Sequence, residues 1–91
     1  MQFKVLNPSY EPRVRASFAR QAVMTLIGAV MTRVEPGHCT IELPVREDLT
    51  QQHGFVHGGV VGMIADSAGG YAAFTLMPAD ASVLTVEYKI N

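Results

Sequence analysis

The most conspicuous candidate for chemistry is a single acidic residue, Asp66, inside a long apolar stretch. Between residues 55 and 77 it is the only formally charged side chain, and no Lys or Arg occurs between Arg46 and Lys89. A salt bridge with a neighbour along the chain therefore cannot account for it. A carboxylate buried without a countercharge can serve as a general base or nucleophile near neutral pH. The alternative is that Asp66 simply reaches solvent or caps a neighbouring loop.

A second candidate is the turn His57-Gly58-Gly59, which opens the same apolar stretch. The first backbone N–H groups of a helix lack intrahelical partners, and paired glycines let a ligand approach them closely. Together with the positive end of the helix dipole, these donors can stabilise negative charge on a carbonyl oxygen. The alternative is a glycine-rich helix start chosen for backbone freedom.

The spacing of these two candidates predicts an assembly. Gly58 and Asp66 are eight residues apart, which is about 12 Å along a helix and too far to act on one carbonyl. We therefore predict a symmetric dimer in which the helix start of one subunit faces Asp66 of the other.

The elements that must position these groups follow from hydrophobic periodicity. Apolar residues at three- to four-residue spacing predict a first helix over residues 14–29 with Arg15 and Arg20 outward. Two short runs, 29–34 and 39–45, flank Pro36-Gly37 and predict a β-hairpin. The apolar residues on that helix and on the second run are Phe18, Ala22, Leu26, Ala29, Ile41, Leu43 and Val45, and Pro44 should end the strand or mark an edge.

The second half of the chain predicts a loop, a long helix and a strand. Residues 46–55 are polar, and residues 58–76 are small or apolar on nearly every side, which is typical of a buried helix. Glycines within this stretch lower its helix propensity. Close approach of a sheet to the helix would explain why they are tolerated there. Residues 82–90 alternate like a strand, with Leu84, Val86, Tyr88 and Ile90 on one face.

Composition excludes several classes of protein. The 91 residues are 48% hydrophobic and 16% charged with a net charge of -1, which indicates one packed domain and no nucleic-acid partner. Cys39 is the only cysteine, so we expect no metal site and a cytoplasmic setting. The glycines and Asp66 argue against a membrane span.

The stretch QQHGFVHGGVVGMIADSAGGYAAFTLM, residues 51–77, together with LTVEYKIN, residues 84–91, resembles the signature of hotdog-fold acyl-CoA thioesterases of the phenylacetyl-CoA type. The resemblance implies an α+β hotdog fold, in which an antiparallel sheet wraps a long central helix. It also implies hydrolysis of a small or aromatic acyl-CoA to free acid and coenzyme A, without a cofactor, by a homodimer or a dimer of dimers.

The resemblance implies roles for Asp66 and for six other residues. Asp66 would attack the thioester or activate water. Gly58 would be the oxyanion donor, Gln51 would orient the water or the thioester, and the Thr85 hydroxyl would hold the water. Thr85 has an equally good structural explanation as a β-branched strand residue. His57 would position the turn and the carbonyl as a further catalytic residue, and the residues expected to contact substrate are His57, Gly59 and Val56.

The family's remaining strands do not follow residue 91, so we expect residues 1–91 to be the N-terminal part of a truncated hotdog domain. Two other functions stay open. The chain could be a non-catalytic module that binds acyl-CoA or an acyl carrier, or it could be an inactive fragment.

Overall fold

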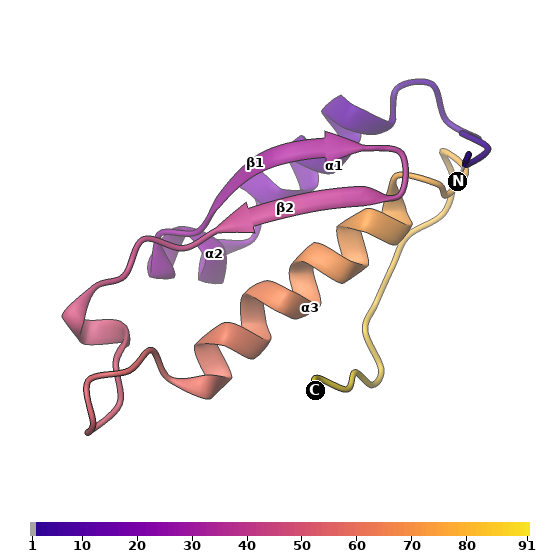
Figure 1. The fold of residues 1–91 in the computed structure, drawn as a ribbon. Helices are drawn as coiled ribbons and strands as arrows, with labels where there is room; N and C mark the ends of the chain where they lie inside the picture. The colour runs from indigo at the N-terminus through magenta and orange to yellow at the C-terminus, as the bar shows by residue number, and fades with distance from the viewer. Residues whose placement is uncertain (1) are drawn as a thin grey trace.

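The computed structural model describes residues 2–91, and its architecture is α+β (Figure 1). The elements in chain order are α1 (Tyr10–Ala19), α2 (Ala22–Ile27), β1 (Val30–Glu35), β2 (His38–Glu42), the 3-10 turn η1 (Glu47–Leu49) and α3 (Gly58–Phe74). No helix within residues 2–91 has the length and apolar character needed to cross a membrane.

The first helical region is broken in two, which corrects the single helix predicted for residues 14–29. Gln21 has an extended backbone between α1 and α2, so the second helix starts in a new phase. Met24 and Ile27 are therefore buried, whereas Leu26 is 73% exposed and does not face the core as predicted. Gly28 ends α2 in the left-handed conformation that glycine adopts without strain.

The predicted hairpin is confirmed. β1 and β2 pair antiparallel from Val30↔Glu42 to Glu35↔His38, joined by the two residues Pro36 and Gly37. Gly37 has a φ of +75°, and a Cβ at this position would collide with the Phe3 ring. β2 ends before Pro44, and Val45 is exposed instead of sharing the inward face of the strand.

One core cluster joins α1, β1 and α3. It contains the buried side chains Val14, Met31, Val34, Tyr71 and Phe74. A second cluster, formed by Met24, Ile27 and Leu49, fixes α2 and η1 against the first half of α3. Together the two clusters hold the long helix in place, and Figure 1 shows this helix lying beside the hairpin.

Only part of the surface of α3 is covered by the described residues, which corrects the expectation of a helix buried on nearly every side. Val61, Ala65, Gly69 and Ala73 form an exposed line along it. The sheet does not explain the helix glycines, because a Cβ at Gly69 or Gly70 would meet nothing within 4 Å. At Gly62 the close neighbour is the hydroxyl of Tyr88, 3.0 Å from such a Cβ.

Residues 82–90 do not form the predicted strand. The segment is extended but has no strand beside it, and Figure 1 shows it running along α3 away from the hairpin. A strand needs backbone hydrogen-bond partners as well as an alternating pattern. Its outward residues Leu84 and Val86 are 90% and 98% exposed.

Candidate active site

Asp66 lies midway along α3 and is held by a hydrogen bond from Thr85. The Thr85 hydroxyl donates to the Asp66 carboxylate at 2.7 Å, so the C-terminal segment reaches this residue from 19 positions away. Asp66 is half-buried, less enclosed than its apolar surroundings in the sequence suggested. Within residues 2–91 no ion pair engages this carboxylate. Its oxygens are therefore accessible to a ligand.

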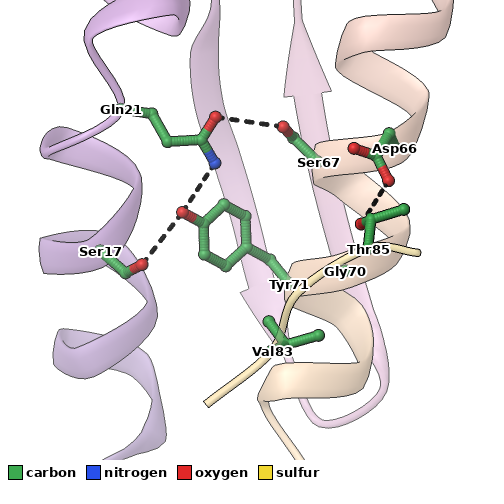
Figure 2. Close-up of a pocket in the computed structure, with 8 residues that line it drawn as sticks. All are labelled: Ser17, Gln21, Asp66, Ser67, Gly70, Tyr71, Val83 and Thr85. Carbon is green, nitrogen blue, oxygen red and sulfur yellow. Dashed lines mark hydrogen bonds between the residues drawn. The ribbon is translucent and has the colours of Figure 1, made fainter.

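A small cavity opens directly beside the Asp66–Thr85 pair. Its volume is about 150 Å³, and Figure 2 shows the eight residues that line it. They are Ser17, Gln21, Asp66, Ser67, Gly70, Tyr71, Val83 and Thr85. On another side of Asp66, a separate hollow is lined by Ala65, Gly69, Tyr88, Lys89 and Ile90. Asp66 thus borders two places where a substrate could lie.

The start of α3 is organised by His57. Its Nδ1 accepts a hydrogen bond from the Gly59 backbone N–H at 2.8 Å, so His57 is the N-cap of the helix. Because Nδ1 accepts this hydrogen bond, a neutral imidazole carries its proton on Nε2, and Nε2 remains a donor. A Cβ at Gly59 would lie 3.0 Å from Nδ1. Glycine at this position therefore allows the cap, and its amide is already engaged.

Gly58 has the free donor of the turn. In the part of the chain that the structure describes, its backbone N–H makes no hydrogen bond. A Cβ at Gly58 would meet nothing within 4 Å, so the space beside this residue is open. The geometry suits a carbonyl oxygen approaching the positive end of a helix of 17 residues.

Gln51 lies in a tight loop that leads to this helix. Its Oε1 accepts from the backbone N–H groups of His53 at 2.6 Å and Phe55 at 3.4 Å. A bridge between Thr50 and Val56 closes the loop, and Val56 is half-buried. The amide oxygen of Gln51 therefore stabilises the loop, which leaves its Nε2 as the group that can meet a ligand.

The structure brings Thr85 to Asp66 but does not bring the helix start to them. Neither cavity that borders Asp66 is lined by His57, Gly58 or Gln51. Because α3 is continuous from Gly58 onward, Gly58 and Asp66 remain about 12 Å apart along its axis. The roles of these residues, and of Gly59 and Val56 in substrate contact, stay predictions.

Sequence reasoning missed a polar cluster on the far wall of the cavity. The Tyr71 hydroxyl is bonded to Gln21 Nε2 at 2.9 Å and to Ser17 Oγ at 3.1 Å. Ser67 Oγ donates to Gln21 Oε1 at 3.4 Å. The only signal in the sequence was the i, i+4 spacing of Ser67 and Tyr71 in an otherwise apolar helix, directly after Asp66.

Comparison with known proteins points to one family. Residues 53–91 match the sequence pattern of the Thioesterase superfamily. The chain is similar to two candidate esterases of Saccharolobus solfataricus, SSO2140 (33% identity over 76% of this chain and 49% of the relative) and SSO1253 (36% over 79% and 47%). It therefore spans about half the length of these curated relatives.

A solved structure shows the same likeness in three dimensions. The crystal structure of a thioesterase family protein from Silicibacter pomeroyi superimposes with a TM-score of 0.87 and 52% identity. The match covers 90% of this chain and 60% of the other. The predicted α+β hotdog fold class is confirmed by this likeness, and the hairpin and the long helix are the parts of that fold in this chain.

Proposed function

We propose that this protein is a thioesterase that hydrolyses a small or aromatic acyl-CoA to a free acid and coenzyme A. The likeness to the Thioesterase superfamily supports thioester or ester hydrolysis in general. The observation that carries the proposal is α3 itself. Its first turn presents the unoccupied Gly58 N–H, and its middle presents Asp66 beside a cavity.

In the proposed reaction the carbonyl oxygen of the thioester accepts a hydrogen bond from Gly58. Asp66 takes a proton from water, whose oxygen bonds to the carbonyl carbon, and the C–S bond then breaks as the sulfur receives a proton. Thr85 holds the Asp66 carboxylate in place. A positioned base of this kind contributes about 10²- to 10⁴-fold to the rate.

The two groups belong to different subunits in this proposal. Because they are about 12 Å apart on one helix, Gly58 of the partner subunit would meet Asp66 across a two-fold axis. A symmetric interface then generates two identical sites per dimer. Dimers of dimers are compatible with the same arrangement. Separately, we propose a cytoplasmic setting, with which the single cysteine, Cys39, agrees.

The test of the function is release of free thiol from butyryl-CoA and phenylacetyl-CoA. Asp66→Asn keeps the size of the side chain and its bond to Thr85, and we expect it to lower kcat by about 10²-fold or more. Asp80→Asn is the matched control, because Asp80 is exposed in the turn after α3. Comparable activity in both variants would refute the assignment.

A related measurement separates hydrolysis from binding alone. Tight binding of either acyl-CoA by the unmodified protein without thiol release would indicate that the protein is a non-catalytic binding module.

A single turnover in ¹⁸O-labelled water distinguishes direct attack by Asp66 on the thioester from activation of water by Asp66. If the carboxylate attacks directly and water then opens the anhydride at the Asp66 carbon, the first acid formed carries an unlabelled oxygen from Asp66 and the label enters Asp66. Activation of water by Asp66 places the label in the acid and leaves Asp66 unlabelled.

A further inference from the structure

The cavity beside Asp66 lies between packed helices, yet the wall farthest from Asp66 is formed by polar groups. Tyr71 is only 5% exposed, yet its hydroxyl points to the amide of Gln21 and the hydroxyl of Ser17. Figure 2 shows Ser17 and Gln21 on the side of α1 and Tyr71 reaching toward them from α3, with Asp66 and Thr85 on the other side of the cavity. The cavity thus has a reactive side and a polar side.

Packing alone does not explain this polar wall. Buried amides and hydroxyls lower stability unless they are hydrogen-bonded, and apolar side chains of the same shape would join the helices equally well. The wall also retains hydrogen-bonding capacity. Gln21 donates one N–H to Tyr71 and accepts one bond from Ser67, whereas a primary amide has two N–H donors and two acceptor lone pairs. A ligand oxygen in the cavity can use what remains.

The dimensions limit what the ligand can be. Ser67 directly follows Asp66 on α3. Tyr71 lies five residues after Asp66, which is about 7.5 Å along the helix axis. A volume of about 150 Å³ holds a group with about six heavy atoms, the size of benzene. A long alkyl chain exceeds this volume, so the cavity favours an acyl group of about four carbons whose far end would reach the polar wall.

We propose that this cavity binds a short acyl group with a hydroxyl or carbonyl oxygen near its far end, and that Gln21 recognises this oxygen. The inference rests on the proposed thioesterase function and deepens it. Plain alkyl acyl groups of the same length would leave the remaining hydrogen-bonding capacity of Gln21 unused, and a site built to bond an oxygen discriminates against analogues that lack it.

The direct experiment compares 3-hydroxybutyryl-CoA with butyryl-CoA, which differ by one hydroxyl. In the unmodified protein we expect kcat/KM to be about tenfold higher for the hydroxylated substrate, the value of one net hydrogen bond. Gln21→Met keeps the length of the side chain and removes its amide, so the ratio should fall toward one. Gln52→Met, the same change on an exposed loop residue, should leave the ratio unaltered.

A second readout makes the inference independent of turnover. Non-hydrolysable thioether analogues, S-(3-hydroxybutyl)-CoA and S-butyl-CoA, should show the same tenfold preference as a ratio of Kd values in titration calorimetry. Tyr71→Phe, which removes only the hydroxyl that orients Gln21, should reduce this ratio if Gln21→Met fails to fold. Preference in binding without any thiol release would contradict the proposed function and support the polar subsite.

Other outcomes overturn the inference itself. Equal kcat/KM values and equal Kd values for the two members of each pair would show that the cavity does not recognise an oxygen. A preference that persists in Gln21→Met would show that another residue recognises it. In both cases hydrolysis of butyryl-CoA would leave the thioesterase function intact.

Discussion

The two halves of α3 are held in different ways. The second half is anchored: Tyr71, Phe74 and the following Thr75 are buried, and Thr75 Oγ1 accepts a hydrogen bond from Gly37 of the hairpin turn at 2.8 Å. In the first half, residues 58, 59 and 61 are exposed and the Gly58 amide is free. Asp66 lies where the two halves meet.

One helix therefore contributes to the stability of the fold through its second half and offers ligand-binding groups in its first half. The anchored half fixes the rotation of α3, and therefore the direction of Asp66, through contacts with α1 and the hairpin. The first half packs against the second cluster through Val60, Met63 and Ile64, but its first turn leaves the Gly58 donor and its surface unoccupied, as a ligand site requires. Regions that bind ligands commonly have few stabilising contacts of their own.

The largest expected effect comes from weakening the anchored half. Phe74 packs in the main core cluster, and the Arg13 guanidinium lies 4.3 Å from the centre of its ring. Phe74→Ala should lower the free energy of unfolding by about 3–5 kcal/mol, measured by urea titration. Val61→Ala, in the exposed part of the first half, should cost under about 1 kcal/mol. Equal losses would contradict the division of α3 into two halves.

At the helix start we expect a loss of activity with little loss of stability. Gly58 is the first helical residue, a position where proline is tolerated although it lacks an N–H. Gly58→Pro should therefore reduce kcat by about 10²- to 10³-fold, the effect of removing one oxyanion donor. Gly58→Ala retains the amide, and its Cβ enters open space. If both variants hydrolyse acyl-CoA equally well, the Gly58 amide has no role.

A smaller effect is expected at the link between the anchored half and Thr85. Arg13 donates hydrogen bonds to the carbonyl oxygens of Pro78 and Ala81, and so restrains the turn that precedes the C-terminal segment. Arg13→Ala should increase hydrogen exchange about tenfold at the Ala81 amide, which donates to the Pro78 carbonyl within this turn, and Arg13→Lys should have an intermediate effect because its ammonium cannot bond both carbonyls as a fork. Arg20→Ala, at an exposed arginine, is the control. Unchanged exchange in Arg13→Ala would show that the turn is held by other contacts.

The smallest effect concerns Cys39, which packs against the core cluster of the anchored half. Burial raises the pKa of this thiol, with Arg15 acting in the opposite direction. A raised pKa lowers the thiolate fraction at a given pH. Alkylation by iodoacetamide at pH 8 should thus be several-fold slower than for glutathione, with its pH profile displaced upward. A rate equal to that of glutathione would indicate that this part of the core opens readily.

Local signals in the sequence were sufficient for the hairpin and for the start of α3. Pro36-Gly37 between two apolar runs requires only neighbouring residues to form a turn, and His57 caps the helix through Gly59, two residues away. Asp66 was identifiable because it is a charge in an apolar stretch. These features depend on interactions over a few residues, so periodicity and turn chemistry reveal them.

Features set by distant contacts could not be predicted. No proline or glycine marks the break at Gln21, whose side chain instead bonds Ser67 and Tyr71 from α3. The alternation of residues 82–90 predicts a strand, but pairing depends on neighbours that the segment does not have beside α3. The polar cavity wall joins residues at least 46 positions apart, which no local pattern encodes.

Mixing two inactive variants tests most directly whether Gly58 and Asp66 act together across subunits. Asp66→Asn and Gly58→Pro chains are combined in equal amounts, unfolded and refolded together, and assayed for thiol release. Half of the dimers should be mixed, and each mixed dimer has one intact site of two, so we expect recovery of about a quarter of the unmodified activity. Activity no higher than that of the separate variants would show that the two groups do not complete a site between chains.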